Sequence, residues 1–359
     1  MKKNINKITL RNTCLSKTDI IVSYMSLYVL YGSIIFFSFK SNAQVLIPTS
    51  ETAFELQHNF NAELIKLKNI KRIVFEVVDK ADFELVVDKN LVETYEFNNN
   101  GQLARFYYTN IIKTIEKQTT VNVSKGRGRK RSNYSTVESH NEYIYDTIST
   151  SYFYSGKNLI LKRYHDGALF YESRYYRHDS LGNVTKEMRF RETNNSKDKT
   201  IFILGGQLLL SEDSLQYKKY SSNQLKCILL NNENRPYKEQ TINYDSLGNK
   251  KTIFEHYTAA AWIMQEQKFE YAGNRLTMAE FKGNANNEVI IKRTYEYDKN
   301  NELYTEKQYK NEVLLKELSY VSDEANHLLN SLVIRDPINK TIRIIKLKYD
   351  FGSVGKAGR

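Results

Sequence analysis

Apolar and polar residues alternate with a period of two along many segments of this chain. In the last such segment, Ile345, Leu347 and Tyr349 fall on one side, and Lys346 and Lys348 fall on the other. This alternation is typical of a β-strand that buries one face and exposes the other. The chain is therefore expected to fold mainly into β-strands.

A short motif recurs along the chain, in which an aromatic residue is followed by a polar Gly/Asn/Asp turn and then by a new strand. Its anchors are Phe97, Tyr154, His178, Tyr220, Tyr244, Tyr271, Tyr297, Tyr320 and Tyr349. Because Asn and Gly tolerate a positive φ, each unit predicts a β-hairpin or its equivalent. A unit of this size cannot bury its own apolar face, so neighbouring units must stack in sequence.

The predicted fold is all-β: an antiparallel array of β-hairpin repeats, forming an extended twisted or curled sheet with a short irregular or helical N-terminal cap. The boundaries are a signal peptide at 1–43, the cap at 44–91 and the repeat domain at 92–359. Within the cap, 51–70 is expected to be a short helix or an irregular lead-in. Strands are expected at 72–78 and 83–87.

The first forty residues have the pattern of an export signal. Basic residues precede an apolar run at 20–39, and the small residues Ser41 and Ala43 follow it, which predicts cleavage after Ala43. The alternative is an uncleaved membrane anchor, because twenty apolar residues can span a bilayer. Either interpretation places the protein outside the cytoplasm, in the periplasm, outside the cell or at its surface.

Composition supports the β interpretation, since aromatic residues make up 13% of the 359 residues and only 3 prolines occur.

The full chain has a net charge of +12, and removal of residues 1–43 leaves +7. Five of these charges fall in the insert 125–131, in a set that makes a candidate anion contact: Lys125, Arg127, Arg129, Lys130 and Arg131. The alternative, which the flexible Gly/Arg composition favours, is a solvated hairpin tip. A single basic loop predicts no specific nucleic-acid binding.

Catalytic, cofactor and metal-binding patterns are not found in the sequence. The six histidines are scattered, without the paired spacing that puts two metal ligands on one helix face. Cys227 lies in an apolar stretch and is expected to be a small core residue rather than a nucleophile. The sequence therefore predicts no cofactor, no metal and no catalytic residue, although paired carboxylates of a β-fold hydrolase would escape notice.

The segments 244–249 and 295–300 resemble the YD repeats of the Rhs family of secreted bacterial proteins. The aromatic-rich export signal that ends in Ser-Asn-Ala-Gln resembles those of the Bacteroidetes. The Rhs resemblance covers about residues 92 to 350 and implies a long antiparallel sheet that can curl into a shell. About nine copies are present, a number expected to be too small for a closed container.

Four Asp-Ser/Thr-aliphatic triplets resemble acceptor sites of Bacteroidetes O-glycosylation. Their hydroxyl residues are Thr147, Ser180, Ser214 and Ser246. The alternative is that each Asp-Ser pair only opens a turn, because both side chains bond to nearby backbone amides.

The sequence as a whole favours a non-catalytic exported repeat protein that acts as a scaffold or binding module of the cell envelope or extracellular space. A glycan or an envelope protein is the expected partner, and only the signal segment is expected to contact a membrane. Two alternatives remain open, a secreted hydrolase of surface polymers and an Rhs-like component associated with toxins or envelope assembly.

Overall fold

The computed structural model describes residues 44–55, 58–81, 83–84, 86–125, 132–198, 201–260, 264–284, 288–323, 326 and 328–352. The described residues belong to one compact unit that begins at Gln44, immediately after the predicted cleavage position. The export signal lies outside them, so its cleavage stays a prediction. No helix among the described residues is long and apolar enough to cross a membrane.

The described residues form eighteen strands and very little helix. The helix is α2 (Ala62–Leu67), and the strands are β1 (Ile70–Ala81), β2 (Val87–Phe97), β3 (Leu103–Lys125), β4 (Ser132–Ser155), β5 (Asn158–His165), β6 (Tyr171–His178), β7 (Val184–Asn194), β8 (Leu204–Ser221), β9 (Gln224–Leu230), β10 (Pro236–Tyr244), β11 (Lys250–Tyr257), β12 (Met264–Ala272), β13 (Arg275–Asn284), β14 (Glu288–Tyr297), β15 (Leu303–Lys310), β16 (Val313–Ser322), β17 (Leu329–Asp336) and β18 (Thr341–Phe351).

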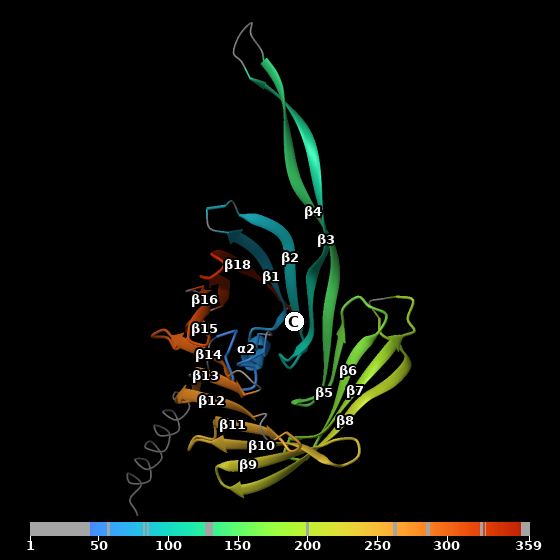
Figure 1. Ribbon diagram of the computed structural model, residues 1–359, viewed down its shortest axis with the longest axis vertical. Helices are drawn as coiled ribbons and strands as arrows, with labels where there is room; N and C mark the ends of the chain where they lie inside the picture. The colour runs from blue at the N-terminus through green and yellow to red at the C-terminus, as the bar shows by residue number, and fades with distance from the viewer. Residues whose placement is uncertain are drawn as a thin grey trace, which may run out of the picture. The chain divides into compact units, whose positions relative to one another are not determined.

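The strands make one closed antiparallel barrel (Figure 1). Each strand pairs with its neighbours in sequence, and β1 closes the ring by pairing with β18 from Ile70–Phe351 to Ala81–Thr341. Strands β3 and β4 pair with each other well beyond the residues that pair with β2 and β5. They therefore extend as a two-stranded ribbon, which Figure 1 shows reaching away from the ring.

The predicted corners lie at strand ends. Each of the nine anchors falls within the last three residues of an even-numbered strand, so one repeat unit corresponds to two strands. Two corners show the geometry that the sequence implied: Gly182 and Gly248 have φ of 86° and 85°, and the Asp179 and Asp245 carboxylates accept backbone amides of their own turns. Asx turns of this kind set the hairpin register.

The expectation that nine copies are too few to close was wrong. Nine units supply eighteen strands, and the last strand meets the first instead of leaving an exposed edge. The all-β hairpin array is therefore confirmed, but it is a closed barrel and not an extended sheet. Closure satisfies the backbone groups that an open array would leave unpaired at both ends.

The segment expected to cap the array has two parts. The predicted strand 72–78 lies within β1, which is a member of the barrel wall. The strand predicted at 83–87 was wrong, because Phe83 has a φ of 65° and β2 begins only at Val87. The remainder, residues 44–69, includes α2 and is called the inner segment here.

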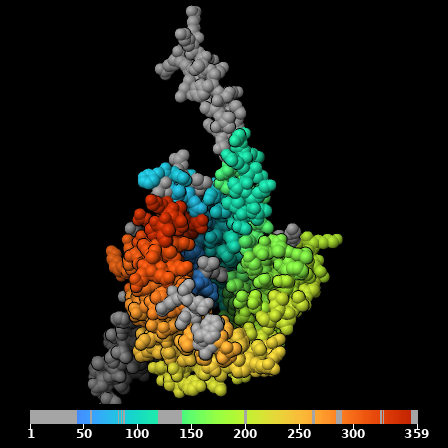
Figure 2. Space-filling view, in the orientation of Figure 1, coloured from blue at the N-terminus to red at the C-terminus, as the bar shows by residue number. Residues whose placement is uncertain are grey.

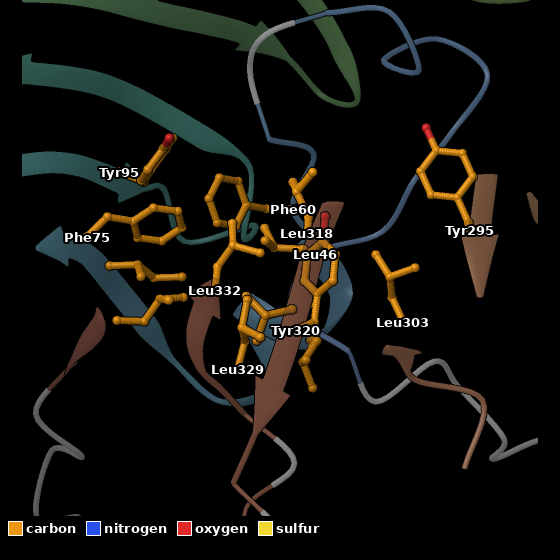
Figure 3. Close-up of a cluster of buried hydrophobic side chains, with 14 of the residues drawn as sticks. Leu46, Phe60, Phe75, Tyr95, Tyr295, Leu303, Leu318, Tyr320, Leu329 and Leu332 are labelled. Carbon is orange, nitrogen blue, oxygen red and sulfur yellow. The ribbon is translucent and has the colours of Figure 1, made fainter. Parts of the chain in front are cut away.

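The inner segment packs inside the barrel (Figures 1 and 3). Its Leu46 and Phe60 share a buried apolar cluster with Phe75 and Tyr95 of the first strands and with Leu332 of β17. The Phe60 and Tyr95 ring centres are 4.8 Å apart. The barrel core is thus completed by residues that precede the first strand in the chain.

The turn between β2 and β3 rests directly on α2, and this contact requires a glycine. Gly101 has a φ of 77°, and a Cβ at this position would lie 1.9 Å from the backbone oxygen of Ala62. Asn61 caps the same helix, because its side chain accepts a hydrogen bond from Leu64 N at 3.2 Å. The close approach at Gly101 fixes the inner segment to the wall, and the Asn61 cap stabilises the helix within that segment.

We predict that Gly101→Ala destabilises the mature chain by at least about 2 kcal/mol more than Gly156→Ala. Both glycines have a positive φ and share the cost of placing a Cβ there, but nothing lies within 4 Å of a Cβ at Gly156. Urea unfolding of residues 44–359, followed by circular dichroism, measures the difference. Equal losses for the two variants would show that the turn does not rest on α2.

Candidate functional site

The strand register assigns each wall residue to one of two faces. Cross-strand partners in an antiparallel pair project from the same face. Starting from the buried Tyr95, one such row crosses five neighbouring strands through Phe106, Thr150, Tyr164, Glu172 and Arg191. We call the face that carries Tyr95 and the core the inner face, and the opposite one the outer face.

Over β10–β18, the inner face is occupied by the inner segment. Phe54 lies between Phe269 and Phe281, with ring centres 6.3 and 5.8 Å away. The buried side chain of Gln44 accepts a hydrogen bond from Leu303 N at 2.6 Å. This part of the wall is largely a packed core, although a cavity of about 360 Å³ remains beside β1, β17 and β18.

The small cavity left in this packed part has a volume of about 60 Å³ and is lined by His58, Arg293 and Glu306. The Glu306 carboxylate accepts hydrogen bonds from Tyr320 Oη and Gln308 Nε2, both at 2.8 Å. The His58 ring centre lies 5.4 Å from that of Phe75. Burial lowers the pKa of His58, although the carboxylates of Glu93 and Glu306 oppose this.

Over β5–β7, the inner face is cationic. Lys162, Arg174 and Arg189 lie directly opposite one another on three adjacent strands, and Arg191 occupies the next row. Arg174 Nη1 lies 3.3 Å from Glu187 Oε1. No ion pair joins Lys162, Arg189 or Arg191 to a carboxylate among the residues that the structure describes. We call these four residues the cationic wall.

Tyrosines flank the cationic wall on the same face. Tyr152 is the cross-strand partner of Lys162, and the Lys162 ammonium lies 5.8 Å from its ring centre. Burial and the nearby carboxylate of Asp166 raise the pKa of Tyr164. Burial also raises the pKa of Tyr176, with further contributions from Glu187 and from Glu55 of the inner segment.

The space-filling view shows these strands, in green, across a hollow from the orange and red strands of the packed half (Figure 2). Blue atoms of the N-terminal part of the chain are visible between the two sides. Within the cationic wall, Arg174 and Arg191 are exposed, and Lys162 and Arg189 are half-buried.

The outer face of the same strands carries a buried ionic network. Glu192 is fully buried, and its carboxylate accepts hydrogen bonds from Arg163 Nε (2.9 Å), Ser173 Oγ (2.5 Å), Tyr175 Oη (2.6 Å) and Gln207 Nε2 (2.9 Å). Burial opposes ionisation, but these donors prevail and lower the pKa of Glu192. One carboxylate therefore ties together β5, β6, β7 and β8.

The segment before β8 covers this network. The Arg163 guanidinium lies 3.7 Å from the ring centre of Phe202, whose ring is 4.9 Å from that of Tyr171. Stacking on Phe202 shields the ion pair from water and fixes the position of Arg163. The network holds the four strands in register from outside.

The structure separates the residues that the sequence had singled out. Lys125 ends β3 at the far end of the ribbon, and Arg127, Arg129, Lys130 and Arg131 lie outside the described residues. Their anion contact therefore stays a prediction.

The four hydroxyl residues also differ in their surroundings. Ser180 and Ser246 are exposed in hairpin turns, whereas Thr147 and Ser214 belong to the paired strands β4 and β8. Cys227 is buried, as expected of a core residue, and burial raises the pKa of its thiol.

Sequence reasoning missed the cationic wall and the Glu192 network. Lys162 and Arg163 look like one basic pair in the sequence because they are adjacent. In a strand, however, adjacent residues project from opposite faces. Only the register shows that Lys162 meets Arg174 and that Arg163 meets Ser173. Period-two alternation within 161–165 and 171–177 was the one available signal, and it did not reveal the partners.

Comparisons with known proteins give limited similarity. No protein family model matches the chain, and no curated protein matches it. Among solved structures, a porin-like protein from Bacteroides uniformis is 10% identical, with 78% of this chain and 98% of that chain covered and a TM-score of 0.33. A porin-like protein from Bacteroides vulgatus is 9% identical over the same shares, with a TM-score of 0.28. A structure of TcdB2-TccC3-TEV is 9% identical over 72% of this chain and 21% of that chain, with a TM-score of 0.16.

We predict that His58 makes the stability of the mature chain fall below neutral pH. The pKa of His58 is lower in the folded than in the unfolded chain, so the unfolded chain binds the proton more readily. This contribution is present above the ordinary histidine pKa of about 6.5 and is lost as the pH falls through it. The free energy of unfolding, measured at pH 8 and pH 5, should fall less for His58→Gln than for the wild type. An equal fall in both proteins would contradict the assignment.

Proposed function

We propose that this protein is a non-catalytic exported binding module, a closed shell that works in the cell envelope or outside the cell and holds its ligand on the inner face of β4–β8. The observation that carries the proposal is the contrast within this inner face. Over β10–β18 it carries most of the buried apolar cluster, against which the inner segment packs, whereas over β5–β7 it presents cations and tyrosines, of which Arg174 and Arg191 are exposed. Surfaces of this composition are used to bind ligands.

The charges of the outer face support a wall that stands in water. Glu76 pairs with Lys348 and Glu296 with Lys307, in each case across neighbouring strands. An outward-facing row of charges is costly in hydrocarbon but ordinary for a sheet face in water. We propose that the barrel works in the aqueous phase after export, with its ligand as a separate molecule.

The inner-face carboxylates favour binding over hydrolysis. Glu187 bonds to Arg174, while Glu255 bonds to Gln240 and pairs with Lys238, and Glu306 bonds to Tyr320. A glycoside hydrolase needs two carboxyl groups that face one substrate bond across a defined gap. These three acids are each held by a neighbouring cation or hydrogen-bond donor, which suits a structural role.

The ribbon of β3 and β4 suits a second contact in this proposal. Its strands extend beyond the barrel, and the basic insert at 125–131 connects them in the chain. An anionic envelope polymer attracted by the insert would be brought near the barrel. The insert is proposed as an accessory contact, and the inner face as the main one.

We predict that the mature chain will bind a glycan on a printed array, or a protein of an envelope protein panel, through its inner face. The double variant Tyr164→Ser, Tyr176→Ser should lose at least about tenfold in affinity for the bound species, since each ring is a large contact surface. The matched control is Tyr309→Ser, on the outer face of β15. Equal loss in the control, or shortening of a bound polymer during incubation, would contradict a non-catalytic inner-face module.

We also propose that Ser180 and Ser246 carry O-linked glycans. Both hydroxyls are exposed at turns. The preceding Asp179 and Asp245 stabilise these turns, because their carboxylates accept hydrogen bonds from backbone amides. Thr147 and Ser214 lie in paired strands, where an acceptor is harder to reach. Intact-mass analysis of the exported protein should show added mass that Ser180→Ala and Ser246→Ala each reduce. An unmodified mass would contradict the proposal.

A further inference from the structure

A cross-strand row of like charges is the least expected feature of the barrel interior. Lys162, Arg174 and Arg189 are directly opposed on β5, β6 and β7. Adjacent strands are about 4.8 Å apart, so the row places three positive charges in a line at close spacing. Like charges directly opposite each other destabilise a sheet.

In two other opposed pairs of cations, one member of each pair has a carboxylate partner. Arg177 faces Lys186, and Lys186 Nζ lies 2.5 Å from Glu212. Lys218 faces Lys226, whose Nζ lies 2.6 Å from Glu239. In the inner row only Arg174 has a carboxylate partner among the described residues. The row therefore keeps positive charge that the protein does not itself balance.

The outer face offsets the cost of this row. Arg163 and Ser173 directly neighbour Lys162 and Arg174 in the chain, and both bond to the buried Glu192 on the other side of the sheet. These charge-assisted bonds hold β5, β6 and β7 together where repulsion on the inner face would separate them. The bonds of the outer face therefore stabilise the same strands that carry the cations, so the sheet can keep this row on its inner face.

We propose that the row Lys162–Arg174–Arg189 binds an acidic polysaccharide, with sugar carboxylates on the cations and sugar rings on the neighbouring tyrosines. This inference rests on the proposed function and names its ligand class. The strand spacing is close to the length of one pyranose unit, so successive acidic sugars meet successive strands. Arg191, one row away, adds a fourth cation on the same face.

Two further features select a sugar acid over a phosphodiester chain. Tyr152 and Tyr164 lie beside Lys162 on the inner face and offer ring faces to pyranose rings. The inner-face carboxylate of Glu172 lies between Tyr164 and Arg191 in register, where it accepts hydrogen bonds from sugar hydroxyls. A DNA backbone carries no hydroxyl donors along its length, so it would offer this carboxylate no hydrogen bond.

The test is calorimetric titration of the mature chain with an oligomer of galacturonate and with the same oligomer after methyl esterification of its carboxylates. The acidic oligomer should bind, and esterification should weaken binding by at least about tenfold. Lys162→Gln and Arg189→Gln should each weaken it by about tenfold, without lowering the midpoint of thermal unfolding, because each removes a repulsive charge.

The matched control is Lys346→Gln, which removes one positive charge from the outer face of β18. It should leave the affinity unchanged. If it weakens binding as much as Arg189→Gln does, the attraction is a net-charge effect and the proposed row is refuted.

The remaining outcomes separate this inference from the proposed function. If a neutral glycan or a protein binds and the Tyr164/Tyr176 variant abolishes that binding, while the galacturonate oligomer does not bind, the ligand class is refuted and the inner-face module stands. If a single-stranded oligonucleotide binds as tightly as the acidic oligomer and Arg189→Gln weakens both, selection for sugar acids is refuted.

Discussion

Backbone hydrogen bonds between β1 and β18 close the ring and remove the two free edges that a line of hairpins would have. Closure also gives every strand two partners, so the register of each pair constrains the next. A slip of one residue in any pair would turn Phe75 or Tyr95 outward and carry charged residues into the core. The register of the whole barrel is therefore set cooperatively by the period-two pattern of all its strands.

The closed ring encloses a space that its own side chains do not fill. The inner segment supplies the missing apolar surface, through Leu46, Phe54, Phe60 and the helix α2. This packing stabilises the barrel, because side chains that line an empty cavity lose van der Waals contacts. The segment packs against β1, β2 and β10–β18, and this uneven filling separates the packed core from the proposed ligand surface on β4–β8.

The two faces of β5–β8 show how a sheet can carry an unfavourable row of charges. Inside, Lys162, Arg174 and Arg189 repel one another. Outside, the Glu192 carboxylate on β7 accepts hydrogen bonds from donors on β5, β6 and β8, in a site shielded by Phe202. A buried and fully bonded carboxylate acts at short range and low local dielectric, so it dominates over repulsion between side chains that reach into solvent. Stability and binding are thereby assigned to opposite faces of one wall.

The sequence by itself determined the local structure. Asp179, Gly182, Asp245 and Gly248 specify their turns because a positive φ and an Asx turn depend only on neighbouring residues. Alternation likewise determined that Ile345 and Leu347 face the core while Lys346 and Lys348 face outward. These features act within a few residues, so they are visible without any knowledge of the fold.

Only the tertiary structure decided that β18 meets β1, that residues 44–69 turn inward and that Lys162 opposes Arg174. Each of these depends on which strands become neighbours, and a period of two is the same whichever strand lies alongside. The Glu192 network has the same origin, since its donors come from three other strands, at positions between 163 and 207. Strand pairing converts a chain of similar hairpins into a barrel with one packed half and one charged, accessible wall.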